Sequence, residues 1–170
     1  MIFFIHLKEI KKDLIKKENI FHLFLVIVIF FFDRYSKLSI INNFNDGIYY
    51  ISDFINLNLT WNIGIGFGLF STTSSLTYNL ITILIGLVIL VLFNFCIKSK
   101  KLEKLTYSII LGGALGNFYD RLVYNAVPDF IDIHYNNFHW FIFNAADIFI
   151  TLGILLLVFN KNNFARNKND

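Results

Sequence analysis

The sequence predicts an all-α membrane protein with four transmembrane helices, both termini in the cytoplasm, and a small β-platform between the first two helices. The composition is the first reason: 56% of the 170 residues are hydrophobic, whereas a soluble domain averages about 45–50% apolar residues. The second reason is four apolar segments, at 20–41, 76–97, 105–122 and 140–159. Each is close to the ~20 residues that a spanning helix needs.

The placement of positive charge is the third reason, and it sets the topology. Twelve of the 15 lysines and arginines lie before the first span, between the second and third, or after the fourth. The two opposite loops, 42–75 and 123–139, contain none. Positive residues mark cytoplasmic loops, so we expect one integral-membrane domain over 1–170, with a basic cytoplasmic segment at 1–19 and a cytoplasmic tail at 160–170. The lysines before the first span are a topology signal, and we expect no nucleic-acid partner.

The first span, 20–41, carries charged residues near its outer end. A cleaved signal peptide would be followed by small residues, but Asp33 begins a charged run instead, so we expect a retained helix. Asp33 and Lys37 are spaced i, i+4 with the acid first, which is the favoured orientation for an ion pair on a helix. The simplest role of this pair is to neutralise both groups and hold the helix in place.

The third and fourth spans each combine an amide with a carboxylate. Asn117, Asp120 and Arg121 follow the spacing i, i+3, i+4, so they share one face of the third helix. Asn144 and Asp147 are spaced i, i+3 on the predicted fourth helix. Polar groups in lipid need partners, so we expect these two faces to meet.

Three of the acids fall at a similar depth. With a rise of 1.5 Å per residue, Asp33, Asp120 and Asp147 lie roughly 18–22 Å from the inner boundaries of their spans. Even on the mildest scale, a charge at the bilayer centre costs about 2.5–3.5 kcal/mol, so an intramembrane carboxylate is a functional candidate by default. Convergence of three of them predicts a site between the midplane and the outer face.

Glycine-rich stretches suggest close packing. In the third span, Gly112 and Gly116 form a small-xxx-small surface on which another helix can approach. In the first outer loop, residues 56–62 alternate in polarity as a half-buried strand does. Gly64, Gly66 and Gly68 follow, where alternate glycines permit close backbone approach; no βαβ unit surrounds them, which excludes a dinucleotide fingerprint.

The second outer loop carries Asp129, Asp132, His134 and His139. These four could form a metal site, but the ligand spacing of zinc proteases is missing, and histidines in loops near a bilayer are usually interfacial. We therefore expect no metal and no cofactor.

Asp129 could instead meet Asp147 where this loop folds back on the fourth helix. Two carboxylates in contact share a proton, so one acts as base and the other as acid. Such a pair can activate water against a peptide carbonyl. The alternative is a small proton-coupled transporter, which also uses buried carboxylates but favours sites near the midplane.

Five blocks, in this order and spacing, are similar to those of the lipoprotein signal peptidases (signal peptidase II). They are residues 33–37, 62–68, 112–121, 127–132 and 143–147. The resemblance implies an aspartic endopeptidase of the bacterial inner membrane, with four helices and a periplasmic β-platform. Its substrate would be a diacylglyceryl-modified prolipoprotein, cut just before the lipidated cysteine. It further implies contact with membrane lipids, inhibition by globomycin and, we expect, a monomer.

The same resemblance assigns roles to individual residues. The catalytic pair would be Asp129 and Asp147. Site-lining residues would be Asn62, Asn117, Arg121 and Asn144, and supporting residues would be Asp33, Lys37, Asp120, Gly64 and Gly116. Three positions depart from the family pattern, namely Gly66, Pro128 and Phe141. None of these changes removes a chemical group, so we expect activity.

Overall fold

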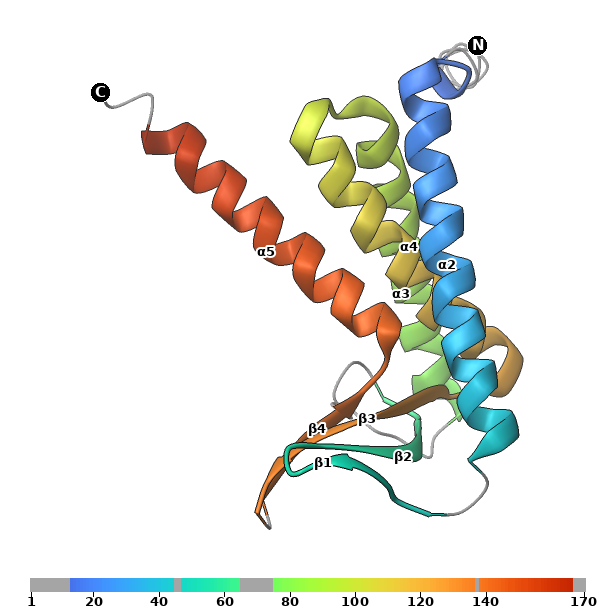
Figure 1. Cartoon of the computed structure of the whole chain (residues 1–170). Helices are drawn as coiled ribbons and strands as arrows, with labels where there is room; N and C mark the ends of the chain where they lie inside the picture. The colour runs from blue at the N-terminus through green and yellow to red at the C-terminus, as the bar shows by residue number, and fades with distance from the viewer. Residues whose placement is uncertain (1–12, 45–46, 65–74, 137, 167–170) are drawn as a thin grey trace.

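The computed structural model describes residues 13–44, 47–64, 75–136 and 138–166. In this part of the chain, four long helices stand on one face of a small sheet (Figure 1). The helices are α2 (Lys17–Asn43), α3 (Ser75–Lys98), α4 (Lys101–Tyr124) and α5 (Ala145–Arg166). The strands are β1 (Tyr49–Ser52), β2 (Ile55–Asn62), β3 (Val127–Tyr135) and β4 (Phe138–Phe143). Helix α2 begins and α5 ends at the end of the bundle far from the sheet.

The prediction of the fourth helix was wrong at its start. Residues 140–143 belong to β4, and α5 begins only at Ala145. The sequence Phe138–Phe143 is almost entirely aromatic and β-branched apart from His139, a composition that favours strands. Asn144 then caps the helix, because asparagine is a preferred residue at that position. Helix α4 extends a few residues beyond the predicted 105–122 at both ends.

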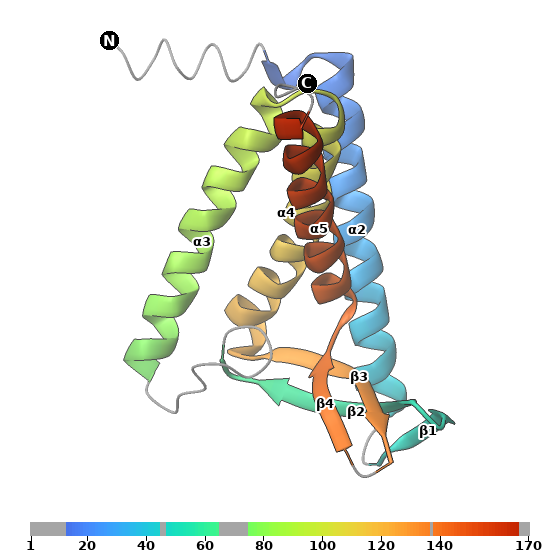
Figure 2. The ribbon, with the colours of Figure 1, turned by 90° about the vertical axis from the view of Figure 1, so that its left-hand side faces the viewer.

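The sheet is larger than the sequence suggested, because both outer loops contribute to it. Its strand order is β1-β2-β3-β4, and each neighbouring pair is antiparallel. The strand predicted at 56–62 is confirmed as β2, whereas the predicted loop 123–139 contains β3 and the start of β4. Pairing of β2 with β3 sets Thr60 opposite Asp129. The sheet therefore carries residues of both loops beneath the helices (Figure 2).

Helix α4 packs closely against both α2 and α5 through its glycines. A Cβ atom at Gly112 would lie 2.7 Å from Cβ of Ile29, and one at Gly116 would overlap Oδ2 of Asp33. On the α5 side, a Cβ at Gly113 would lie 2.6 Å from the carbonyl oxygen of Ala146. The close approach predicted from Gly112 and Gly116 is confirmed.

The outward surfaces of the helices are apolar. Phe21, Phe24 and Phe31 on α2, and Leu80 and Leu87 on α3, are all exposed. Within the described residues, one helical segment, Leu76–Lys98, is long and apolar enough by itself to cross a membrane, and Ala145–Asn160 is a shorter apolar helix. Helices α2 and α4 carry charged residues that face each other inside the bundle. An apolar exterior with polar groups inside is expected where the surrounding medium is lipid.

Candidate active site

A buried ammonium group joins α2 to α4. Nζ of Lys37 donates to Oδ2 of Asp33 at 2.7 Å, to Oδ1 of Asn117 at 2.8 Å and to Oδ2 of Asp120 at 2.7 Å. The side chains of Lys37, Asp33 and Asp120 are fully buried. A lysine has three donors, so this one has all of them satisfied. The ion pair predicted between Asp33 and Lys37 is confirmed.

Arg34 completes the charge balance of this network. Its guanidinium pairs with Oδ1 of Asp120 and lies 4.7 Å from the ring centroid of Tyr119. Two cations and two carboxylates therefore neutralise one another inside the bundle. The sequence-based prediction gave Arg34 no role. Its position directly after Asp33, inside an apolar span, could have marked it as a further partner for a buried carboxylate.

Asp147 lies in the first turn of α5, where it forms a reciprocal cap with Asn144. The backbone N–H of Asn144 donates to Oδ2 of Asp147 at 3.1 Å, and the N–H of Asp147 donates to Oδ1 of Asn144 at 3.1 Å. This exchange is the capping-box arrangement. Asn144 was predicted to be on the helix and is its cap instead.

Asn117 links the ion network to Asp147. Its Nδ2 donates to Oδ1 of Asp147 at 2.8 Å, while its Oδ1 accepts from Lys37. Because the ammonium of Lys37 can only donate hydrogen bonds, the amide oxygen of Asn117 must face Lys37 and its NH₂ group must face Asp147. Asp33 provides a second link between the ion network and the start of α5, because its Oδ1 accepts a hydrogen bond from the backbone N–H of Ala146 at 2.9 Å.

Asp129 projects from β3 and is held by two amides. Nδ2 of Asn144 donates to its Oδ1 at 2.5 Å, and Nδ2 of Asn62 donates to its Oδ2 at 2.9 Å. The side chain of Asn62 is itself oriented, because its Oδ1 accepts from the backbone N–H of Gly64 at 2.9 Å. Pro128 occupies the preceding position in β3, opposite Trp61.

Asn144 contacts both carboxylates, so Asp129 and Asp147 come together at one asparagine. Burial raises the pKa of Asp129 to about 6, and the neighbouring charge of Asp147 adds to this rise. The hydrogen bonds from Asn62 and Asn144 act in the opposite direction and favour the ionised form. The meeting of the second loop with the fourth helix, predicted from the sequence, is present.

Arg121 supports the loop that carries Asn62. Its guanidinium donates to the carbonyl oxygen of Gly64 at 2.9 Å and to that of Asn117 at 3.0 Å. Arg121 shares a helical face with Asp120, but Asp120 pairs with Arg34 and Lys37 instead. Gly64 is thus engaged through both its N–H and its carbonyl group. Gly66 and Gly68, singled out in the same motif, lie outside the described residues.

An apolar cavity of about 300 Å³ opens beside Asp147. Its walls come from β3, β4 and α5, and include Ile133, Phe143, Ile148 and Leu152. A second apolar cavity lies between α2, α4 and α5, and Leu152 lines it too. A carboxylate at the edge of such a space can reach a polar group on a ligand whose bulk is hydrocarbon.

The family model of signal peptidase (SPase) II matches residues 25–162. The chain belongs to the signal peptidase II family. It is 49% identical over 145 residues to the lipoprotein signal peptidase of Pelagibacter ubique (strain HTCC1062), covering 84% of this chain and 87% of the relative. The corresponding protein of Wigglesworthia glossinidia brevipalpis is 40% identical over 148 residues, covering 84% of this chain and 95% of the relative. The resemblance drawn from the sequence is confirmed.

Solved structures agree with this assignment to signal peptidase II. A bacterial membrane enzyme determined by the in meso method at 2.3 Å resolution superposes with a TM-score of 0.70 at 28% identity, covering 86% of this chain and 90% of the other. A similar structure at 1.9 Å resolution gives a TM-score of 0.65, again at 28% identity, over 82% and 90% of the two chains. Membership of this family sets aside the transporter alternative.

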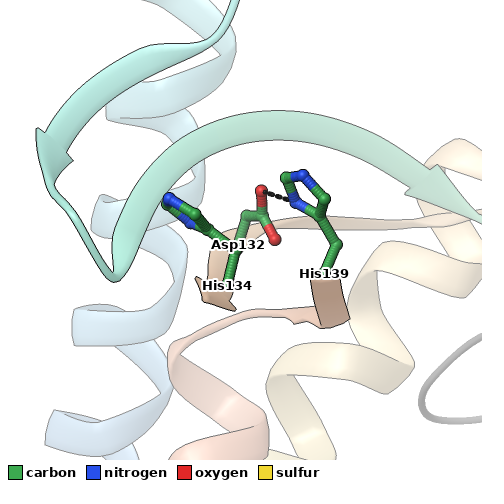
Figure 3. A group of neighbouring side chains, drawn as sticks. All are labelled: Asp132, His134 and His139. Atoms are coloured by element: carbon green, nitrogen blue, oxygen red, sulfur yellow. Dashed lines mark hydrogen bonds and ion pairs between the residues drawn. The ribbon is translucent and has the colours of Figure 1, made fainter. Parts of the chain in front are cut away.

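The residues that the sequence assigned to the signal peptidase II site therefore fall into one connected group. Hydrogen bonds and ion pairs join the described site residues, from Lys37 through Asn117 to Asp147, and through Asn144 to Asp129. The other loop residues weighed as metal ligands, Asp132, His134 and His139, form a separate cluster (Figure 3).

Proposed function

We propose that this chain removes signal peptides from diacylglyceryl-modified prolipoproteins, cutting just before the lipidated cysteine, with Asp129 and Asp147 as the catalytic pair. One observation carries the assignment of the pair. Two carboxylates from different elements, β3 and α5, are bound to the same asparagine, Asn144. Each of them also accepts a further amide hydrogen bond that fixes its orientation, from Asn62 or Asn117.

The chemistry follows from the sharing of one proton. At neutral pH the two neighbouring acids cannot both ionise easily. The ionised carboxylate takes a proton from water, whose oxygen attacks the scissile carbonyl carbon, while the protonated carboxyl donates its proton to the carbonyl oxygen. Collapse of the tetrahedral intermediate breaks the C–N bond: one carboxyl gives its proton to the leaving amine, and the other carboxylate takes a proton from a hydroxyl of the intermediate, which restores the starting state of the pair. The raised pKa of Asp129 supports this scheme, because it keeps a proton available near neutrality.

We further propose that α2, α3, α4 and α5 all cross the inner membrane, with both termini in the cytoplasm and the whole chain forming one domain. The apolar exterior of the helices supports this. So does the connection between α3 and α4, which holds Lys98, Lys100, Lys101 and Lys104 at the end of the bundle far from the sheet. By the positive-inside rule that end is cytoplasmic. The catalytic pair then lies near the periplasmic face.

The apolar cavity beside Asp147 supports a lipid-bearing substrate. Each buried CH₂ of an acyl chain contributes about 0.8 kcal/mol, so a diacylglyceryl group can hold the cleavage site beside the carboxylates. A water-soluble peptide has no such anchor. We expect globomycin to inhibit by occupying the pair, the protein to act as a monomer surrounded by membrane lipids, and no cofactor to take part in the cleavage.

A gel-shift assay tests this function. The purified protein is incubated with a prolipoprotein that carries diacylglycerol on its cysteine, and with the same precursor lacking the lipid. We expect cleavage of the lipidated precursor alone, and its loss when globomycin is added. Equal cleavage of both precursors, or cleavage of neither, would contradict the proposal.

A further inference from the structure

Three potential metal ligands come together on the sheet, apart from the catalytic pair. Asp132 and His134 belong to β3 and His139 belongs to β4, and one donor atom from each lies within 4.8 Å of the others (Figure 3). Oδ2 of Asp132 and Nδ1 of His139 are 2.8 Å apart. The two imidazole rings stack with their centroids 5.3 Å apart.

The local strand pairing produces this cluster. Between Asp132 and His134 the register of β3 with β4 shifts by one residue, so that His139 lies opposite His134. A bulge of this kind re-aims a side chain. Asp129 and Asp132 are three positions apart on one strand, so their side chains leave opposite faces. The cluster therefore lies on the face of β3 away from the catalytic carboxylate.

Unpaired polar atoms point to a ligand at this place. Within the described residues, four buried side-chain atoms have no hydrogen-bond partner, and three of them are Oδ1 of Asp132, Nδ1 of His134 and Oδ1 of Asn56. Asn56 lies directly opposite Asp132 in the sheet, so the two side chains leave the same face. Both residues are at least nine-tenths buried. A buried polar group without a hydrogen-bond partner is destabilising, and here three such groups are neighbours.

We propose that Asp132, His134 and His139 bind a divalent transition metal ion, with Zn²⁺ as the best fit. Two imidazoles and one carboxylate are donors that Zn²⁺ accepts, whereas Ca²⁺ and Mg²⁺ prefer oxygen ligands alone. Ligand bonds of about 2.0–2.2 Å put tetrahedral donors about 3.4 Å apart. The donors lie within 4.8 Å of one another, and the exposed side chain of His139 is free to adjust toward that spacing.

The bound ion would cross-link β3 to β4. A water on the fourth position could donate to the oxygen of Asn56, which would satisfy another unpaired atom. Because Asp129 lies on β3, a metal ion that joins β3 to β4 would limit the movement of the strand that carries Asp129 without contacting the catalytic pair. This site rests on its own residues and stands independently of the proposed cleavage mechanism.

Calorimetric titration of the full chain with ZnCl₂ tests this site. The protein is used in detergent at pH 7.5, with any polyhistidine tag removed. We expect one ion per chain, with affinity lowered at least about tenfold in His134→Ala and in His139→Ala, and reduced in the parent at pH 5.5 because protonated imidazoles do not bind metal. His22→Ala is the matched control, since His22 lies on α2, where the interactions described for its ring are with the carbonyl oxygen of Glu18 and the ring of Phe21.

Thermal unfolding gives a second readout. Zn²⁺ should raise the melting temperature of the parent and of His22→Ala, and leave that of His139→Ala unchanged. Basal prolipoprotein cleavage in EDTA should be the same in all four proteins, which shows that the variants fold. Absence of binding to the parent, or equal affinity in the parent and both ligand variants, would overturn the proposal.

Discussion

Replacing Lys37 by methionine tests the buried ion network most severely. The change keeps the length of the side chain but removes the cation that binds Asp33, Asn117 and Asp120. Asp120 would retain Arg34, and Asp33 would retain only the N–H of Ala146. Breaking a buried pair by removing one partner costs about 3–5 kcal/mol. At about 2–4 °C per kcal/mol for a chain of this size, the melting temperature should fall by on the order of 10 °C.

Activity should fall as well, because Lys37 orients the amide of Asn117 that binds Asp147. The assay is thermal unfolding in detergent, combined with cleavage of a lipidated prolipoprotein below the melting temperature of the variant. Lys16→Met is the matched control, because its ion pair with Asp13 lies at the surface, where water screens the two charges and the pair contributes little to stability. If both variants melted within about 2 °C of the parent, the network would not have the stabilising role assigned to it.

Three other changes address the neighbouring parts of the site. Burial raises the pKa of Asp129 from 3.8 to about 6, so its ionisation opposes folding. The contribution of Asp129 to stability should be greatest below pH 4 and should fall by about 3 kcal/mol at most as the pH rises to about 6 and above. Unfolding at several pH values measures this contribution, and the stability of Asp129→Asn should change less over the same range. For the same reason kcat/KM should fall on the alkaline side as the shared proton is lost, and a rate that kept rising through pH 8 would contradict a shared proton. Gly116→Ala should lower the melting temperature and activity together, because its Cβ would overlap Asp33, whereas Gly47→Ala, which has no atom within 4 Å of its Cβ, should behave as the parent. Asn117→Ala should lower kcat more than it raises KM, because it releases Asp147, and an unchanged kcat would remove Asn117 from the site.

Much of the site could be predicted from the sequence, because helical spacing is a strong constraint. Asp33 and Lys37 share a helical face because they are spaced i, i+4, and so do Gly112 and Gly116. The ion pair predicted from the first spacing and the close helix contact predicted from the second are both present in the structure. Polar groups in an apolar span also have few possible partners, so the expectation that the polar faces of the third and fourth spans would meet needed no knowledge of the fold, and the contact of Asn117 with Asp147 confirms it.

The remaining features depend on long-range contacts that spacing does not encode. Asp120 had three possible cationic partners, Arg34, Lys37 and Arg121, and the packing of α2 against α4 selects the first two. The aromatic run before Asn144 is apolar enough to extend a helix, yet it pairs with β3. Strand pairing between two separate loops also brought Asn62 to Asp129, which no local pattern in either loop predicts.

Cleavage by single-site variants of the two aspartates tests the central claim most directly. Asp129→Asn and Asp147→Asn preserve shape and remove the ability to ionise, while one acceptor oxygen of each carboxylate becomes an NH₂ donor. Each should abolish cleavage of a lipidated prolipoprotein, while the variant still inserts in the membrane and melts no lower than Asp120→Asn. Substantial residual cleavage by either folded variant would show that its aspartate does not take part in the chemistry.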